Sequence, residues 1–451
     1  MAYNTANKTF FILTACVWAI FGIVWYFFPG LTTGNFIALY LISFGYILLT
    51  RYTAFASDSA SVVMAAATVL VGCGVIINAW YFTAGLGGTP DNPILINPDS
   101  NRWWNDALYL LGSTNCEQAP PQHGLYGAIL ACVLWIFGAT VGTALLWSMT
   151  ILSGALLMVG IVTYRLTSTK VTAVVSMACT AAVCYWLSMG TLILKDAFVI
   201  FAMILGAYSF TCRKSRFFAF LAVSATMLAL SRPNCILMLV AGILIVYLRH
   251  KDFVWSSLAA VLCICLWAAA HTLSLSPNFV YIVSTSYDND IFFGEQQKAY
   301  FNIIGDYSCY PFYKKILILP LSAAVQFMIP FPWNFMRDIP FGLTQAYAHF
   351  GYPWYIFGFM TVYFLVSRWR DYSSLIYRLT VWGLVCWLIP CYLFGGTVSR
   401  YGLPMVAIFA PAVALTLYRN YKSVRFYSFL GVYCVILAVV LIIAHNLHTS
   451  A

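Results

Sequence analysis

Charged residues are scarce in this chain. Of its 451 residues only 8% are Asp, Glu, Lys or Arg, whereas soluble globular domains carry about a quarter. Apolar and aromatic residues make up 62%, and the mean hydropathy is +0.85. This balance excludes a soluble globular protein. Apolar runs close to the roughly 20 residues that cross a bilayer core recur along the chain, so we expect a polytopic α-helical membrane protein.

The signature motifs of several enzyme classes are also missing. The chain has no Gly-x-x-x-x-Gly-Lys loop, no His-Glu-x-x-His, no Cys-x-x-Cys and no Gly-x-Ser-x-Gly. Nucleotide hydrolysis, zinc proteolysis and serine hydrolysis therefore lack support. Twelve of the 14 cysteines lie in or beside apolar runs, where a thiol behaves as a small hydrophobe. Cys116 and Cys309 lie in long polar loops, and they would bridge these loops if the compartment is oxidising.

Thirteen membrane spans are predicted from the apolar runs. They lie near residues 10–28, 35–50, 60–82, 143–163, 171–190, 196–212, 217–231, 235–248, 254–272, 350–366, 379–395, 401–417 and 426–445. Two further apolar segments, 125–141 and 316–335, are ambiguous by hydropathy alone. If both are interfacial helices, most Lys and Arg residues fall on one side of the membrane, as the positive-inside rule requires. The rule also accounts for the net charge of +10, so no nucleic-acid partner is needed.

This topology predicts one all-α, membrane-embedded domain over residues 1–451. The N-terminus is cytoplasmic and the C-terminus external, as in a multi-pass protein of an inner membrane. Two large external loops, at about 83–142 and 273–349, each carry one interfacial helix. Most residues that are polar enough for chemistry collect on the external, periplasmic face.

The first external loop contains a candidate catalytic carboxylate. Asp99 and Trp103 are four residues apart in the run that begins Asn97-Pro98-Asp99, so they share a face of a helix. Asp99 is suited to take a proton from an acceptor, and Arg102, Trp103 and Trp104 are candidate substrate-binding residues. Alternatively, Asp99 only caps the helix and the tryptophans belong to an interfacial aromatic belt.

Three further external positions carry charge beside apolar segments. Lys195 and Asp196 begin a span, Arg232 lies in a Ser-Arg-Pro-Asn turn, and Arg400 precedes Tyr401 at the mouth of another span. Ionisable residues in apolar surroundings are candidate functional residues. Two arginines and a lysine on one face suit a lipid-linked phosphate. The alternatives are that Lys195 and Asp196 mark the membrane boundary and that each arginine only reaches to the interface.

Several short motifs resemble those of one enzyme superfamily. They are Asp99 with Trp103 and Ala107, Pro120-Pro121 leading to Phe137-Gly138, Leu194-Lys195-Asp196, Arg232, and Arg400-Tyr401 with Pro404. In this order they resemble the GT-C membrane glycosyltransferases, and in particular the protein O-mannosyltransferases and the aminoarabinose transferases. The resemblance implies an inverting transfer of a sugar from a polyprenyl-phosphate donor to a glycan, lipid or protein acceptor.

The resemblance also implies roles for individual residues. Asp99 would deprotonate the acceptor, and Lys195, Arg232 and Arg400 would hold the departing lipid phosphate. Asp196 would orient Lys195 or bind a divalent cation. The chain departs from the family pattern, because two additional spans precede the acidic loop and the usual double acidic motif is missing. Asp91 and Asp106 are therefore alternative bases.

Two other functions stay open at this point. A polysaccharide polymerase or ligase that acts on lipid-pyrophosphate glycans needs the same external arginines. A flippase or transporter for a lipid-linked oligosaccharide predicts charges deep in the bundle and related halves. The clustering of charge at one face favours an enzyme.

Overall fold

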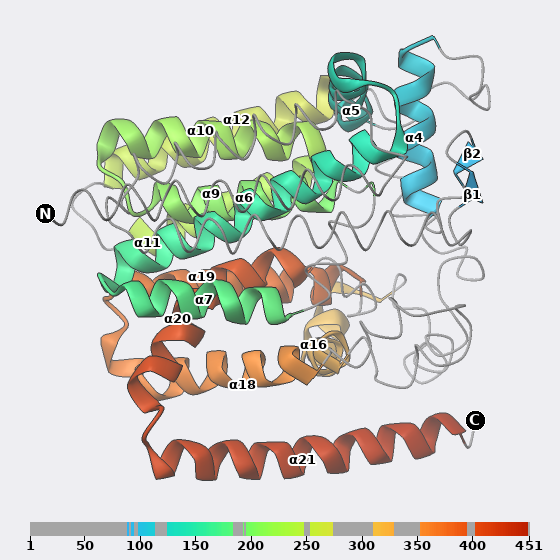
Figure 1. The fold of residues 1–451 in the computed structure, drawn as a ribbon. Coiled ribbons are helices and arrows are strands. Elements are labelled where there is room, and N and C mark those ends of the chain that lie inside the picture. The colour runs from blue at the N-terminus through green and yellow to red at the C-terminus, as the bar shows by residue number, and fades with distance from the viewer. Residues whose placement is uncertain are drawn as a thin grey trace, which may run out of the picture. The chain divides into compact units, whose positions relative to one another are not determined.

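A computed structural model of the chain is almost entirely helical (Figure 1). It describes residues 88–89, 92–93, 98–112, 124–183, 193, 195–247, 253–273, 310–328, 352–394 and 402–449. Thirteen α-helices lie in these ranges, together with a two-residue antiparallel pairing of β1 (Gly88–Thr89) with β2 (Asn92–Pro93). The predicted all-α class is thus confirmed for the described part of the chain.

Three of the described helices are long and apolar enough to cross a membrane, judged by length and composition. They are α6 (Val141–Thr167), α19 (Leu375–Phe394) and α21 (Val424–Thr449). Further apolar helices of 10–17 residues lie at most of the other predicted spans. The predicted spans at 10–28, 35–50 and 60–82 lie outside the described residues.

The chain divides into two compact units. The first unit comprises residues 1–181 and 186–275, and the second comprises residues 182–185 and 276–451. The other helices of the first unit are α4 (Pro98–Leu110), α5 (Gly124–Phe137), α7 (Lys170–Ala182), α9 (Asp196–Ser209), α10 (Lys214–Ser231), α11 (Ile236–Tyr247) and α12 (Phe253–Leu273). Those of the second unit are α16 (Phe312–Met328), α18 (Tyr352–Ser367) and α20 (Leu403–Asn420). The single domain expected over 1–451 stays a prediction.

Helix α9 is the core of the first unit. Its sequence is apolar on all sides, and a helix of this kind is stable only when it is enclosed. Every α9 residue except Phe201 is buried, including Asp196, the only charged residue of the helix. Helices α6 and α10 pack against it, and the Ser224 hydroxyl of α10 donates a 2.6 Å hydrogen bond to the Ala202 carbonyl. The enclosure fixes the position of the α9 N-terminus.

The end of α10 is determined by a proline. Pro233 disfavours a helical conformation in the residue before it, and Arg232 accordingly adopts φ −144° and ψ 85°. A short 3-10 turn, η1 (Pro233–Cys235), then leads into α11. Because α9 and α10 are antiparallel neighbours, α9 begins where α10 ends. Helices α4 and α5 lie at this same end of the first unit (Figure 1).

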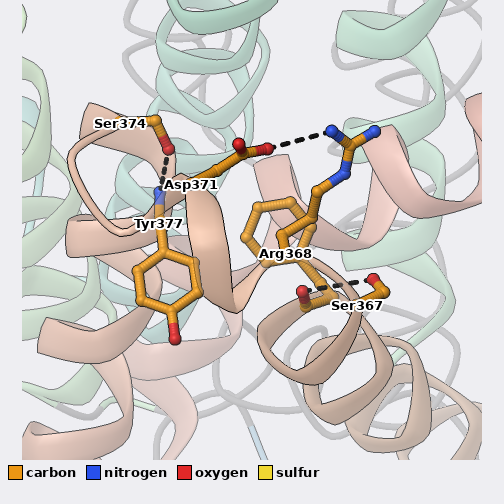
Figure 2. A network of polar contacts seen from close by, with 6 residues as sticks. Ser367, Arg368, Asp371, Ser374 and Tyr377 are labelled. Carbon is orange, nitrogen blue, oxygen red and sulfur yellow. Dashed lines mark hydrogen bonds and ion pairs between the residues drawn. The ribbon is translucent and has the colours of Figure 1, made fainter.

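Aromatic contacts hold α16, α18 and α21 together in the second unit. The Trp354 indole of α18 donates a 3.0 Å hydrogen bond to the Phe327 carbonyl of α16, and the Phe327 ring packs against Gly358. The Tyr433 hydroxyl of α21 donates to the Tyr355 carbonyl at 2.9 Å. The turn between α18 and α19 carries an exposed ion pair, in which Arg368 donates to Asp371 at 2.9 Å (Figure 2).

We expect Gly358→Ala to destabilise the protein by about 1–3 kcal/mol, the usual cost of overpacking. A Cβ atom at this position would lie 2.8 Å from Phe327 Cζ, so the aromatic ring would have to move. The matched control is Gly431→Ala on α21, where nothing lies within 4 Å, and where alanine favours the helix. Denaturation midpoints in detergent measure both effects. Equal midpoints for Gly358→Ala and the wild type would contradict the packing.

Candidate functional site

The N-terminus of α9 brings two charged residues into the first unit. Asp196 is the first residue of the helix and Lys195 directly precedes it. A carboxylate is favoured here because it interacts with the positive end of the helix dipole. Since α9 is enclosed, Asp196 is only 4% exposed. The cost of burying its charge requires a compensating partner.

Arg232 provides that partner. Its Nη2 atom lies 2.9 Å from Asp196 Oδ1, and the two side chains are 15% and 6% exposed. The other carboxylate oxygen, Oδ2, is buried and makes no hydrogen bond within the described part of the chain. Removing one member of such a pair leaves a buried charge, which is strongly destabilising. The pair therefore ties the end of α10 to the start of α9.

Three aromatic rings, those of Trp103, Tyr126 and Phe198, contact one another in sequence beside the charged residues. Lys195 Nζ lies 4.8 Å from the ring centroid of Trp103 on α4. Trp103 meets Tyr126 of α5 edge to face at 5.3 Å, and Tyr126 meets Phe198 of α9 at 6.4 Å. A cation above a tryptophan face is stabilised by the ring quadrupole. The resulting cluster, which we call the α9 cluster, comprises Lys195, Asp196, Arg232, Trp103 and Tyr126.

The turn after α10 adjoins the α9 cluster. Asn234 accepts a 3.3 Å hydrogen bond from the Trp267 indole of α12. A contact with α12 therefore holds the turn that carries Arg232.

Asp106 is a second buried carboxyl group on α4, one turn beyond Trp103. It is 8% exposed, and its Oδ2 makes no hydrogen bond to any described group. Burial raises the pKa of this carboxyl, and the positive charge of Arg102 partly opposes the effect. A Cβ atom on Gly127 of α5 would lie 3.1 Å from the Asp106 Cβ. Close packing of α4 on α5 therefore keeps water from this group.

The structure brings together four of the predicted site residues: Trp103, Lys195, Asp196 and Arg232. Trp104 is buried on α4, whereas Arg102 lies on the exposed face of that helix. Asp99 lies in the first turn of α4, but its side chain is outside the described residues.

Several predicted positions fall in the undescribed part of the chain. They are Asp91, Cys116, Cys309, Arg400 and Tyr401. Sequence reasoning also missed one member of the cluster, Tyr126. The sequence indicates this residue by the hydroxyl group of a tyrosine within the otherwise apolar helix α5. A buried tyrosine hydroxyl usually needs a polar neighbour, so Tyr126 is expected beside a polar group.

The α9 cluster combines an arginine and a lysine, which are groups suited to binding an anion, with a buried tryptophan ring. No three His, Cys, Asp or Glu side chains gather as a metal site within the described ranges. Comparisons with protein-family models, curated proteins and solved structures return no match.

We expect Lys195 and Trp103 to be energetically coupled. In a double-mutant cycle with Lys195→Met and Trp103→Leu, the coupling free energy should be about 1–2 kcal/mol, because the contact is partly desolvated. Lys314 and Tyr310 are the control, since Lys314 Nζ lies 3.5 Å from that ring centroid and is exposed. Its coupling should be about 0.5 kcal/mol. Chemical unfolding in detergent measures both, and no coupling in the first pair would refute the contact.

Proposed function

We propose that the protein is an inverting GT-C-type glycosyltransferase that moves a sugar from a polyprenyl-phosphate donor to an acceptor. The observation that carries the proposal is the α9 cluster, in which Arg232 pairs with the buried Asp196 carboxylate and the neighbouring Lys195 lies over the Trp103 ring. The proposal includes a bundle of about thirteen spans in an inner membrane. In it the N-terminus is cytoplasmic and the active face is external, in contact with membrane lipids.

The cations of the cluster would bind the donor phosphate. Negative charge grows on this phosphate as the sugar leaves, and fixed cations stabilise that charge best in a site shielded from water. A guanidinium has five N–H donors, so Arg232 can hold Asp196 and a phosphate oxygen together. Asp196 then acts as a positioning residue for Arg232 and Lys195. Arg400 and Tyr401, which the sequence resemblance also assigns to the donor phosphate, lie outside the described residues.

The transfer itself needs a base and a leaving group. The acceptor oxygen attacks the anomeric carbon while its proton passes to the Asp99 carboxylate. The bond between the anomeric carbon and the phosphate oxygen breaks, and its electron pair stays on the phosphate. One displacement inverts the anomeric configuration. Trp103 and Trp104 would pack against the sugar or the lipid. The Asp196 carboxylate pairs with Arg232, and this contact supports the positioning role of Asp196 rather than the binding of a divalent cation.

The test is a donor panel with the purified full chain in lipid nanodiscs. Labelled sugars are offered on polyprenyl-monophosphate and polyprenyl-pyrophosphate carriers, and NMR of the product gives the anomeric configuration. We expect turnover from a monophosphate donor with inversion. The control variant is Arg368→Gln, which breaks an exposed pair in the second unit and should transfer at the wild-type rate.

Two outcomes would refute the proposal. Turnover from pyrophosphate donors alone would identify a polymerase or ligase of lipid-linked glycans. Absence of transfer from every donor, with movement of the lipid-linked sugar across reconstituted vesicles, would identify a flippase or transporter.

A further inference from the structure

Three arginines gather at the C-terminal end of α9, the opposite end of this helix from the α9 cluster. Arg165 lies in the last turn of α6 and contacts the turn that joins α9 to α10. Arg213 is the N-cap of α10, and Arg216 lies in its first turn. Arg165 is half-buried, whereas the other two are exposed. We call these three residues the arginine cluster.

Contacts with the end of α9 hold Arg165 in one position. Its Nη1 donates hydrogen bonds to the Thr211 carbonyl at 3.5 Å, the Thr211 hydroxyl at 3.4 Å and the Cys212 sulfur at 3.3 Å. Its guanidinium carbon lies 4.7 Å from the ring centroid of Tyr208, which is a cation–π contact. No described group accepts a hydrogen bond from its Nη2. An arginine that only oriented the chain in a membrane would need its charge but not this fixed geometry.

No acid in the described part of the first unit compensates the arginine cluster. The acids described there are Asp99, Asp106 and Asp196, which lie on α4 and at the start of α9. The sequence that joins α11 to α12, residues 248–252, adds two basic residues and one acid. Cations in the first turn of a helix oppose its dipole, and the first turn of α10 contains no acidic residue. Arg213 and Arg216 therefore destabilise the start of α10 unless an anion binds beside them.

Aromatic residues beside the arginine cluster indicate the kind of anion. Phe218 of α10 meets Trp255 of α12 edge to face at 6.0 Å. Trp255 is 48% exposed, and its neighbour Val254 is 74% exposed. Exposed tryptophans at the ends of apolar helices are typical of the membrane–water interface. The arginine cluster thus lies at the level of lipid headgroups, where the available anions are lipid phosphates.

We propose that the arginine cluster binds the headgroup of an anionic phospholipid. The planar guanidinium group suits a phosphate, to which it can donate two parallel hydrogen bonds. Basic residues beside membrane-spanning helices attract anionic lipids. The inference goes beyond the proposed glycosyl transfer, because the arginine cluster shares no residue with the α9 cluster. It rests on the membrane location of these helices and not on the transfer of a sugar.

The test is native mass spectrometry of the delipidated full chain in detergent. The protein is titrated with phosphatidylglycerol and with phosphatidylcholine that carry the same acyl chains, so only the headgroup charge differs. We expect the first phosphatidylglycerol to bind the wild type about tenfold or more tightly than the first phosphatidylcholine.

Substitutions locate the binding within the fold. Each basic residue near an anionic lipid contributes roughly fivefold to affinity. The variant Arg213→Gln with Arg216→Gln should therefore bind phosphatidylglycerol about 25-fold more weakly, and Arg165→Gln about fivefold more weakly. The control is Arg368→Gln, which removes the same charge from an arginine that already pairs with Asp371, and it should bind like the wild type.

Three results would overturn the proposal. Equal affinity of the wild type for the two lipids would leave the arginines with a role in topology alone, and this comparison needs no variant to fold. Wild-type affinity in both Arg165→Gln and the double variant would place the lipid elsewhere. Displacement of the bound lipid by an equimolar amount of glycerol 3-phosphate would identify a soluble phosphate as the ligand.

Discussion

Arg232→Gln should destabilise the protein by about 3 kcal/mol and abolish measurable donor binding. The substitution leaves the Asp196 carboxylate buried without its cation, and loss of one partner of a buried pair costs about 3–5 kcal/mol. The loss should lie at the lower end of this range because the Arg232 side chain is 15% exposed. Unfolding in detergent gives the change in stability, and a polyprenyl-phosphate binding assay gives the change in affinity.

The exposed ion pair between α18 and α19 is a matched control for this experiment. Arg368 and Asp371 are also 2.9 Å apart, but their side chains are 38% and 52% exposed. Such surface pairs contribute at most about 1 kcal/mol, so Arg368→Gln should change stability little and donor binding not at all. The double variant Arg232→Gln with Asp196→Asn should regain part of the lost stability but no donor binding. Recovery of donor binding in that double variant would show that Arg232 is only structural.

Asp99→Asn should lower sugar transfer by about 100-fold or more, which is the usual contribution of a general base. The matched variant is Asp106→Asn on the same helix. Both substitutions replace a carboxylate with an amide of the same shape, so the difference between them is one of position. Initial rates with a saturating polyprenyl-monophosphate donor compare them. A large loss with Asp106→Asn and none with Asp99→Asn would make Asp106 the base.

Asp106→Asn should also change how stability depends on pH. Burial raises the pKa of Asp106 in the folded protein above its ordinary value of 3.8. At pH values between the pKa of the unfolded chain and that of the folded protein, the folded protein therefore binds more protons than the unfolded chain. The free energy of unfolding therefore falls as pH rises through this window. The variant lacks that slope, and at pH 7 it should be more stable than the wild type. Identical pH profiles for the two proteins would contradict the burial of this carboxyl.

The positions of the helices were largely predictable from local sequence patterns. The apolar segments at 125–141 and 316–335 overlap α5 and α16, so their helical state is confirmed over the described residues, and their interfacial position stays a prediction. Pro233 separates α10 from α11 as its missing N–H requires. The charged pair Lys195-Asp196 also marks the start of α9. These features depend on neighbours within a few residues, which a sequence displays directly.

The partners of the site residues were not predictable in the same way. Trp103 meets Tyr126 across a loop, Asp106 packs on Gly127, and Gln326 meets Cys391 on another helix. Each contact depends on how two helices are rotated about their axes. Hydropathy shows which face of a helix is apolar, but α5 and α9 are apolar on nearly all sides. Their rotation is therefore set by packing and not by pattern.

The enclosure of α9 has a consequence for biosynthesis. With 14 residues it is about 21 Å long, shorter than the roughly 30 Å of hydrocarbon in a bilayer. A short helix that starts with a carboxylate is a poor substrate for insertion on its own. In the proposed topology of thirteen spans, we therefore expect the translocon to release α9 together with α10, as a hairpin in which Arg232 neutralises Asp196. Nascent chains that stop before residue 232 should accordingly fail to integrate α9.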